Sequence, residues 1–253
     1  MLKPEICDIR RRSRQGATQP FLCRADDGRQ YWVKGTKAGN EALCAEWIAG
    51  RIGQIMGLPI PEMAQVIVPE ELIAASAMEK IEELGAGIRF GSSHVEGAQE
   101  FDKSHVGLTE EPLRQLLLVF DVWIRNTDRT VSRAYGANGN PNLLWDTAGK
   151  QLRVIDHNNA FLLNDLYQPS EYARHVFAEE RQRLTPKFKA DAIARMNNAL
   201  GQLDAIMEEI PEAWKTVDGI TDLHRLTLSE VRRIMSAFLM DEETFWKRVE
   251  GVS

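Results

Sequence analysis

The first third of the chain carries the sequence signals of β-strands, and the remainder carries those of helices. Two short β-type runs, at residues 21–24 and 31–34, flank Asp27-Gly28, a dipeptide that is typical of a hairpin turn. Apolar residues at helical spacing follow over residues 39–56, and such spacing dominates from residue 110 onwards. This order predicts an α+β fold with two unequal lobes: a small β-rich lobe with one main helix, and a larger helical lobe across a cleft.

The length of 253 residues suffices for two lobes of this kind. A helical pattern over residues 69–84 ends at two glycines, Gly85 and Gly87, and the sequence GIRFGS after them indicates a short extended crossing. We therefore expect an N-lobe over residues 1–87 and a C-lobe over residues 88–253.

Composition excludes several classes of protein. The net charge of -6 argues against general nucleic-acid binding, and 43% apolar residues argue against disorder. The three cysteines (Cys7, Cys23 and Cys44) have no metal-binding spacing and suggest no disulfide framework, as expected in a reducing cytosol. There is no secretory signal pattern and no apolar stretch of about 18 residues. We expect a cytoplasmic protein that is not inserted in a membrane.

Two aspartates and one asparagine lie at the ends of apolar segments between residues 126 and 161. Asp128 follows a long apolar helix, Asn142 precedes the run Leu143–Trp145, and Asp156 follows Val154-Ile155. The two runs predict a hairpin around residues 147–149, which brings Asn142 and Asp156 together at its open end. Phosphoryl transfer needs a carboxylate that orients a hydroxyl, and oxygen ligands that hold Mg²⁺.

The alternative for these three residues is that each one only caps a turn, as Asn and Asp often do. An aspartate at the C-terminal end of a helix, however, is unfavourable with respect to the helix dipole, and this applies to Asp128. We therefore favour the functional interpretation, with Asp128 as the catalytic residue and Asn142 and Asp156 as metal ligands.

Lys34 ends a short strand of large apolar residues and could contact nucleotide phosphates. Taken alone, it is better explained as a lysine that protects an edge strand from aggregation. Protein kinases fix such a lysine with a glutamate on the next helix, and two glutamates are available here. We prefer Glu46, because Glu41 lies near the helix start, where a carboxylate already complements the dipole.

The segment Gly16, Ala17, Thr18 and Gln19 precedes the first hairpin strand and could offer backbone N–H groups to phosphate oxygens. An ordinary loop explains a single glycine equally well. His157, next to Asp156, is expected to be a structural histidine.

At this point the chain resembles the HipA-like kinases, a bacterial family related in fold to protein kinases and phosphatidylinositol kinases. The resemblance covers most of the chain and rests on short motifs in the family's order: SRQGATQP, YWVKG, AEWIAGRIGQIMGLPIP, GIRFGS, FDVWIRNTDR, PNLLW and VIDHNNAF. It implies a two-lobed fold that binds ATP and Mg²⁺ in the cleft.

Carried over by position, Lys34 would contact the ATP phosphates, Glu46 would pair with it, and residues 16–19 would cover the phosphates. Residues Ile88, Arg89 and Phe90 would form the hinge that reads adenine through backbone groups. Asp128 would accept the proton of the acceptor hydroxyl, and Asn142 and Asp156 would bind Mg²⁺.

The sequence departs from the family after Asp128. Relatives usually have a histidine two positions later and the metal-binding asparagine about five positions later, where this chain has Thr130 and Arg133. Residues 131–141 resemble an insertion, so the metal role moves to Asn142, with Asn138 or Asn140 as alternatives. We also expect the chain to lack the additional N-terminal domain of full-length HipA-type toxins.

These observations predict an ATP- and Mg²⁺-dependent kinase that phosphorylates a hydroxyl, in the first place that of a protein serine or threonine, its own included. One alternative is a nucleotide-binding pseudokinase that acts as a regulatory or toxin–antitoxin-type module with a partner protein. The other is a kinase of small molecules or of phosphoinositide-like lipids.

Overall fold

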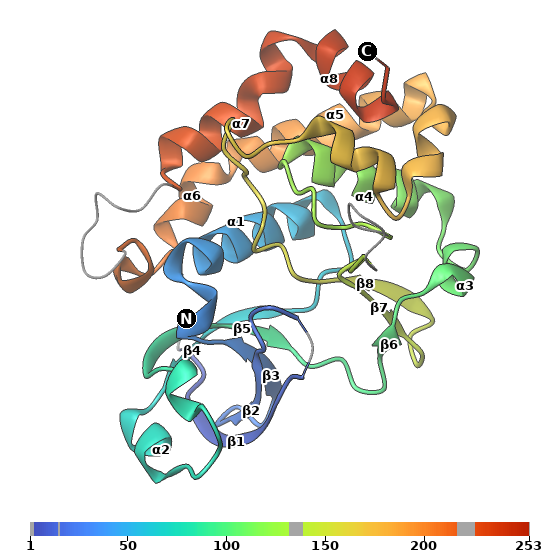
Figure 1. Ribbon diagram of the computed structural model, residues 1–253. Coiled ribbons are helices and arrows are strands. Elements are labelled where there is room, and N and C mark those ends of the chain that lie inside the picture. Colours follow the sequence, from blue (N-terminus) through green and yellow to red (C-terminus); the bar gives the residue numbers. More distant parts are fainter. Residues whose placement is uncertain (1–2, 15, 132–138, 217–225, 253) are drawn as a thin grey trace. The chain divides into compact units, whose positions relative to one another are not determined.

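The computed structural model describes residues 3–14, 16–131, 139–216 and 226–252, and the chain divides into two compact units (Figure 1). Unit 1 comprises Met1–Trp47, Pro61–Glu96 and Ile210–Arg225, and unit 2 comprises Ile48–Ile60, Gly97–Glu209 and Leu226–Ser253. The α+β class is confirmed, with the larger sheet in unit 1 and most helices in unit 2.

Unit 1 is built on a five-stranded antiparallel sheet. Its strands are β1 (Ile6–Arg12), β2 (Phe21–Ala25), β3 (Gln30–Lys34), β4 (Met63–Val68) and β5 (Gly87–Ser93), in the order β1-β2-β3-β5-β4. The predicted hairpin is confirmed: β2 pairs with β3, and Gly28 in the turn has a φ of 80°. One face of the sheet buries a core that includes Phe21, Tyr31 and Val66.

The single boundary predicted between residues 87 and 88 needs correction. The segment after Gly87 is a full strand of the sheet, paired with β3 on one side and β4 on the other. The sequence is short and flanked by glycines, so it resembled a connection between the lobes. Its pairing with two distant strands leaves no local signal in the sequence. The chain passes from unit 1 to unit 2 at residues 96–97 instead, and it also changes units near residues 47, 60, 209 and 225.

Of the two helices predicted in the first hundred residues, one forms as expected and the other is shorter. Helix α1 (Asn40–Met56) confirms the predicted helix over residues 39–56. The pattern over residues 69–84, however, forms only α2 (Glu70–Ala75) and the 3₁₀ turn η2 (Ile81–Glu83). The 3₁₀ turn η1 (Thr36–Ala38) lies between β3 and α1.

Unit 2 contains a second, smaller sheet of β6 (Gln99–Glu100), β7 (Leu143–Asp146) and β8 (Gln151–Val154). The β7–β8 hairpin confirms the turn predicted at residues 147–149, and its register places Leu143 opposite Val154. Asn142 therefore enters the hairpin at the same end at which the chain leaves toward Asp156.

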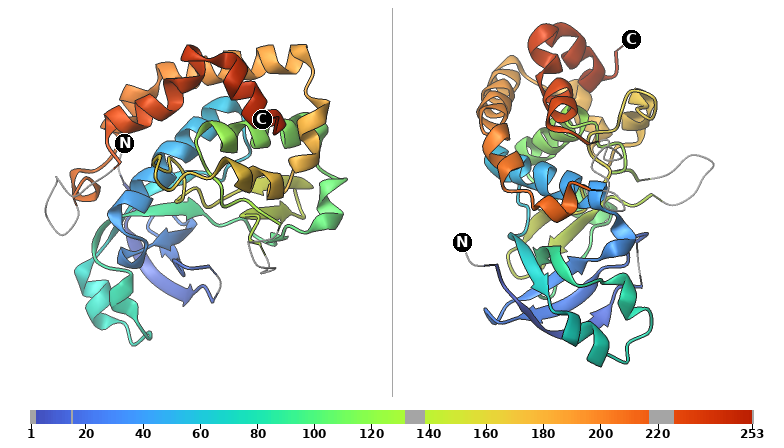
Figure 2. Two further views of the ribbon diagram at one scale, coloured as in Figure 1. Left: turned by 45° about the horizontal axis from the view of Figure 1, so that its top comes forward. Right: turned by 90° about the vertical axis from the view of Figure 1, so that its left-hand side faces the viewer.

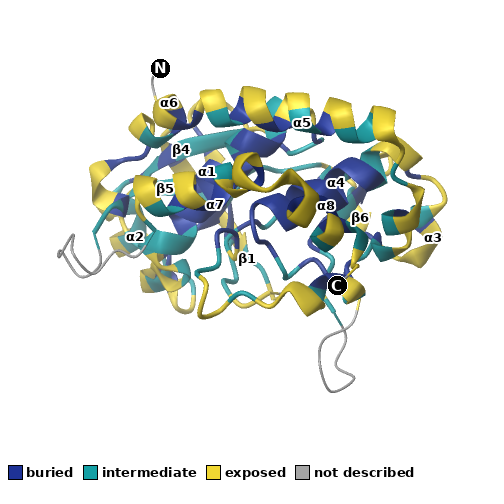
Figure 3. Cartoon of the chain, turned by 90° about the horizontal axis from the view of Figure 1, so that it is seen from above, coloured by how far each residue is buried: buried dark blue, intermediate teal, exposed yellow. Residues whose placement is uncertain are grey.

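The helices of unit 2 are α3 (Lys103–Val106), α4 (Glu111–Trp123), α5 (Pro186–Gly201), α6 (Leu203–Glu208), α7 (Leu228–Met240) and α8 (Glu242–Glu250). Three 3₁₀ segments complete the described helical structure of the chain: η4 (Pro169–Arg174) and η5 (Ala178–Arg183) in unit 2, and η6 (Glu212–Trp214) in unit 1. Helix α4 is buried over most of its length and contacts α5, α7 and α8 (Figures 2 and 3). The Trp123 indole donates to the Met235 carbonyl of α7 at 2.8 Å. The end of α4, from which Asp128 follows, is thus fixed to the helical core.

No helix among the described residues is long and apolar enough to cross a membrane.

Candidate active site

In unit 1, the last residue of β3 forms a buried ion pair with helix α1. The Lys34 Nζ lies 2.5 Å from the Glu46 Oε2, and both side chains are more than nine-tenths buried. Two charges withdrawn from water in this way are tolerated only as a close pair. Glu41, the competing candidate, lies in the first turn of α1 and is half-buried. The structure therefore brings together the pair that was preferred on sequence grounds.

The backbone directly after Lys34 packs against η2. A Cβ atom on Gly35 would lie 2.1 Å from the Glu83 carbonyl oxygen, so only glycine fits at this position. The Thr36 hydroxyl donates to the same carbonyl at 3.0 Å. This close approach holds the end of β3, and with it the base of Lys34.

The loop that contains Gly16–Gln19 is closed at its base by a hydrogen bond from the Ser13 N–H to the Pro20 carbonyl, at 2.8 Å. Gly16 and Gln19 both have positive φ, 76° and 45°. Gln19 is held on both sides, because its carbonyl accepts from Arg12 and its side-chain oxygen accepts from Lys37. A Cβ on Gly16 would meet nothing within 4 Å, so there is open space beside its α-carbon.

The three residues expected to form an adenine-reading hinge lie inside β5. Ile88 pairs with Ile67, Arg89 with Val66 and Phe90 with Gln65. The Ile88 carbonyl accepts the indole N–H of Trp214 at 2.8 Å, and the Phe90 side chain is buried in the sheet. The chain passes from unit 1 to unit 2 at residues 96–97, so these three residues lie ahead of the connection that they were expected to form.

In unit 2, Asp128 accepts hydrogen bonds from two amide side chains. Its Oδ2 atom lies 3.1 Å from the Asn142 Nδ2 and 3.0 Å from the Asn159 Nδ2. Asn159 belongs to the segment just after Asp156, so the carboxylate is held from both sides of the hairpin opening. The side chain of Asp128 is half-buried.

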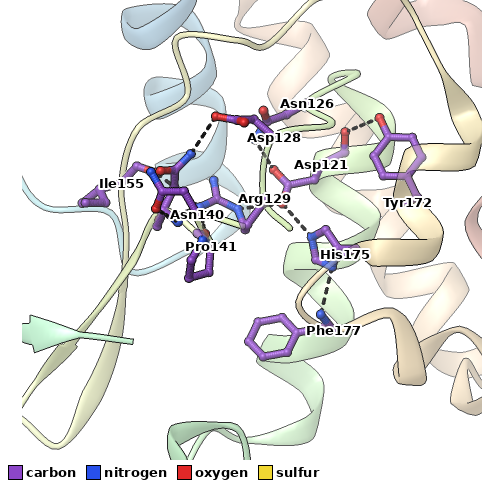
Figure 4. Close-up of polar contacts among 11 residues, drawn as sticks. Asp121, Asn126, Asp128, Arg129, Asn140, Pro141, Ile155, Tyr172, His175 and Phe177 are labelled. Atoms are coloured by element: carbon purple, nitrogen blue, oxygen red, sulfur yellow. Dashed lines mark hydrogen bonds and ion pairs between the residues drawn. The ribbon is translucent and has the colours of Figure 1, made fainter. Parts of the chain in front are cut away.

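Arg129 connects the loop that carries Asp128 to the chain on both sides of the open end of the β7–β8 hairpin (Figure 4). Its side chain is fully buried, and one terminal nitrogen donates to the carbonyls of Pro141 (3.0 Å), Asn142 (2.6 Å) and Ile155 (3.2 Å). One guanidinium therefore fixes the backbone beside both predicted metal ligands.

The guanidinium of Arg129 is itself fixed by Asp121 of α4. The Asp121 Oδ2 accepts from the Arg129 Nε at 2.8 Å and lies 2.9 Å from the His175 Nε2, while the Oδ1 accepts from Asn126. Burial alone would raise the pKa of Asp121, but Arg129 and His175 outweigh it and hold this pKa below its ordinary value.

His175 acts as a neutral donor in this arrangement. Its Nδ1 accepts the Phe177 backbone N–H at 3.1 Å, which leaves the proton on Nε2 for Asp121. Burial lowers the pKa of His175, although the Asp121 carboxylate acts in the opposite direction. The Tyr172 hydroxyl donates to the Asp121 backbone carbonyl at 3.1 Å, which connects this buried layer to η4 (Figure 4).

The backbone conformation at the two predicted metal ligands is unusual. Asn142 and Asp156 both have positive φ, 51° and 60°, and the Ile155 N–H donates to the Asn142 carbonyl at 3.1 Å. Non-glycine residues adopt this conformation rarely, and it is concentrated at functional sites. The structure thus brings the two residues to the same end of the hairpin, as predicted.

The donor set at this end suits Mg²⁺. Asn142 uses its Nδ2 for Asp128, which leaves the amide oxygen for a cation, and Asp156 supplies a carboxylate. No group of three or more His, Cys, Asp or Glu side chains suited to a metal occurs in the part of the chain that the structure describes. Mg²⁺ in phosphoryl-transfer enzymes needs no such cage, because substrate phosphates and water complete its coordination.

The two other asparagines that were considered as ligands differ from Asn142. The Asn140 side chain is exposed, and its oxygen accepts the Asn142 backbone N–H at 3.1 Å, as in a turn. Asn138 lies outside the described residues, as do Arg133 and most of the insertion over residues 131–141. His157 is buried and packs edge-on against Phe120 at 5.9 Å, in keeping with a structural histidine.

Sequence reasoning missed Asp121, Arg129, His175 and Asn159. A signal existed for Asp121, the one charged residue in the apolar run LLLVFDVW, since a carboxylate there is buried and requires a partner. The partners lie 8 and 54 residues further along the chain and have no local signal.

The fold and these two sets of residues define the class of protein kinase-like phosphotransferases. A family model described as HipA-like kinase matches residues 6–249, and the chain belongs to this family. The fold is also that of a solved structure, "Crystal structure of A Helicobacter pylori proinflammatory kinase CtkA", at 11% identity and a TM-score of 0.56, over 98% of this chain and 97% of that one. No curated protein matches the chain.

Proposed function

We propose that this protein is an ATP- and Mg²⁺-dependent kinase that transfers the γ-phosphoryl group to the hydroxyl of a protein serine or threonine. The observation that carries the proposal is the arrangement around Arg129, which fixes Asp128, Asn142 and the chain before Asp156 as one unit. An arrangement that served only to cap turns would not require a fully buried guanidinium bonded to three carbonyls.

In the proposed reaction, the acceptor hydroxyl oxygen attacks the γ-phosphorus and the bond to the oxygen that bridges the β- and γ-phosphates breaks, so that ADP leaves. The Asp128 carboxylate orients the hydroxyl and accepts its proton, while the Asn142 and Asn159 amides hold the carboxylate in place. Asn142 and Asp156 would hold Mg²⁺, which when bound neutralises charge on the phosphate oxygens.

In unit 1, Lys34 would place its charge on the ATP phosphates, with Glu46 fixing the direction of its side chain. The loop of Gly16, Ala17, Thr18 and Gln19 would cover the phosphates through its backbone N–H groups. Residues 88–90 are committed to the sheet, so we place adenine recognition on the backbone that follows β5, between residues 94 and 96.

The test is transfer of label from ATP labelled at the γ-phosphate, with Mg²⁺, to the protein itself and to a mixture of serine and threonine peptides. Asp128→Asn should abolish transfer while it leaves nucleotide binding within about twofold, because it removes the proton acceptor and keeps the shape. Asp191→Asn, an exposed aspartate on α5, is the matched control and should transfer at the wild-type rate.

Two outcomes would point elsewhere. A protein that binds ATP but labels no acceptor, with Asp128→Asn indistinguishable from wild type, would be a nucleotide-binding pseudokinase. ATP turnover that is stimulated only by a protein-free extract would indicate a small-molecule or lipid acceptor.

A further inference from the structure

A small pocket lies in unit 2 at the C-terminal end of α4, against α7 and α8. Its volume is about 70 Å³, and its lining includes the basic residues Arg125 and Arg248 together with Thr244. Pockets for drug-sized ligands are several times larger, so this one suits a compact chemical group.

Both guanidinium groups at the pocket are held in fixed orientations by one aromatic ring. The Cζ atom of Arg125 lies 4.8 Å from the centre of the Tyr167 ring, and that of Arg248 lies 5.5 Å from it. Arg125 is nine-tenths buried and also donates to the Asn164 side chain at 2.6 Å. A stacked guanidinium keeps its planar fork of N–H donors directed, which prepares it for a planar or tetrahedral anion.

The pocket lining carries two arginines and one carboxylate, so its net charge is positive. Among the described residues, neither Arg125 nor Arg248 has a carboxylate within ion-pair distance. One carboxylate, that of Asp241, belongs to the lining, but it caps α8 by accepting the Thr244 N–H at 2.9 Å. Arg125 is a buried charge without a counter-ion, which is costly, and a bound anion would remove that cost.

Neighbouring arginines increase this cost. Burial is the main cause that lowers the pKa of Arg125, and the charges of Arg233 and Arg248 lower the same pKa further. Like charges are thus gathered around a side chain that is largely withdrawn from water.

We propose that Arg125 and Arg248 form a binding site for a phosphoryl group, either as free phosphate or on a phosphorylated serine or threonine of a peptide. Two guanidinium forks and the Thr244 hydroxyl can donate to the three terminal oxygens of a phosphate monoester, which matches it better than a carboxylate with two oxygens. This site is separate from the residues assigned to nucleotide and metal.

The position of Arg125 connects the site to the rest of unit 2. It lies three residues before Asp128 in the chain, and it bonds Leu162 and Asn164, which follow the segment of Asp156. A phosphoryl group on Arg125 would therefore order both the start of the loop that carries Asp128 and the segment that follows Asp156.

The site is tested without nucleotide, so the result is independent of the proposed kinase activity. The protein, labelled with ¹⁵N at arginine, is titrated in turn with inorganic phosphate and with a short phosphoserine peptide, at constant pH and ionic strength, while the Nε–Hε signals are followed. We expect saturable shifts of two arginine signals. If both ligands saturate the site, it recognises the phosphoryl group itself. If the peptide saturates the site and free phosphate does not, the site recognises a phosphorylated chain.

Three variants make the test specific. Arg248→Gln should weaken binding about tenfold or more, since it removes charged hydrogen bonds. Lys247→Gln removes the same charge one residue away, from an exposed side chain, and should bind within about twofold of wild type. Arg232→Gln removes an exposed arginine of α7 that pairs with Asp204, and it should also bind as wild type does.

Equal losses in Arg248→Gln and Lys247→Gln would overturn the proposal in favour of diffuse electrostatic attraction, as would shifts that never saturate. Should Arg248→Gln fail to fold, Arg248→Lys, which keeps the charge but loses the planar fork, takes its place. Wild-type affinity in Arg248→Lys would then refute the bidentate site.

Discussion

Replacement of Arg129 by methionine should destabilise unit 2 severely. The substitution keeps much of the side-chain length but leaves the Asp121 carboxylate fully buried without its ion-pair partner. It also removes the Arg129 donor from the carbonyls of Pro141 and Ile155, while the Asn142 carbonyl keeps the Ile155 N–H. Breaking a buried pair costs about 3–5 kcal/mol, and a buried acceptor that loses its hydrogen bond costs about 1–3 kcal/mol. Because these contributions are not additive, we expect a loss of about 4–8 kcal/mol.

The assay is urea-induced unfolding followed by tryptophan fluorescence. Arg232→Met, which removes an exposed arginine paired with Asp204, is the matched control and should cost less than about 1 kcal/mol. Arg129→Lys keeps the charge but not the fork of N–H donors, so its loss of stability should lie between those of Arg129→Met and Arg232→Met. An Arg129→Met protein within about 1 kcal/mol of wild type would refute the role assigned to this residue.

Three further outcomes are expected. Lys34→Met and Glu46→Gln should each destabilise unit 1 by about 3 kcal/mol, and the double variant by less than the sum, as measured in a urea double-mutant cycle; additive losses would mean that the two are not coupled. Gly35→Ala should lower the melting temperature by several degrees, because its Cβ would lie 2.1 Å from the Glu83 carbonyl, and an unchanged melting temperature would contradict that approach. The pKa of His175 is lowered in the folded state, so below about pH 6.5 the unfolded chain binds more protons than the folded protein, and the free energy of unfolding falls with decreasing pH. His175→Gln should reduce the slope of the free energy of unfolding against pH by up to about 1.4 kcal/mol per pH unit. An unchanged slope would argue against a neutral buried ring.

Much of the fold was predictable where the signal is local. The Asp27-Gly28 turn, the periodicity of α1 and the apolar run of α4 lie within short windows of sequence, and each element formed as expected. Strand β5 was missed as a sheet strand, because its identity depends on pairing with β3 and β4, which lie far away in the chain.

The same distinction applies to the candidate site. Asn142 and Asp156 flank one hairpin, and Lys34 and Glu46 belong to consecutive elements, so their proximity followed from short-range patterns. The buried set of Asp121, Arg129 and His175 could not be predicted, because Asp121 contacts His175 only through the packing of α4 against a segment 54 residues later in the chain. The hinge assignment was displaced for a similar reason, since it depended on where the sheet ends.

The structure that tests the proposed function most directly is a crystal structure of the protein with a non-hydrolysable ATP analogue and Mg²⁺. We predict Mg²⁺ at about 2.0–2.1 Å from the Asn142 amide oxygen and an Asp156 carboxylate oxygen, with analogue phosphate oxygens completing the coordination and Lys34 contacting the phosphates. Mg²⁺ held by Asn140 without Asp156, or an analogue bound away from both Lys34 and Asp156, would contradict the proposed site.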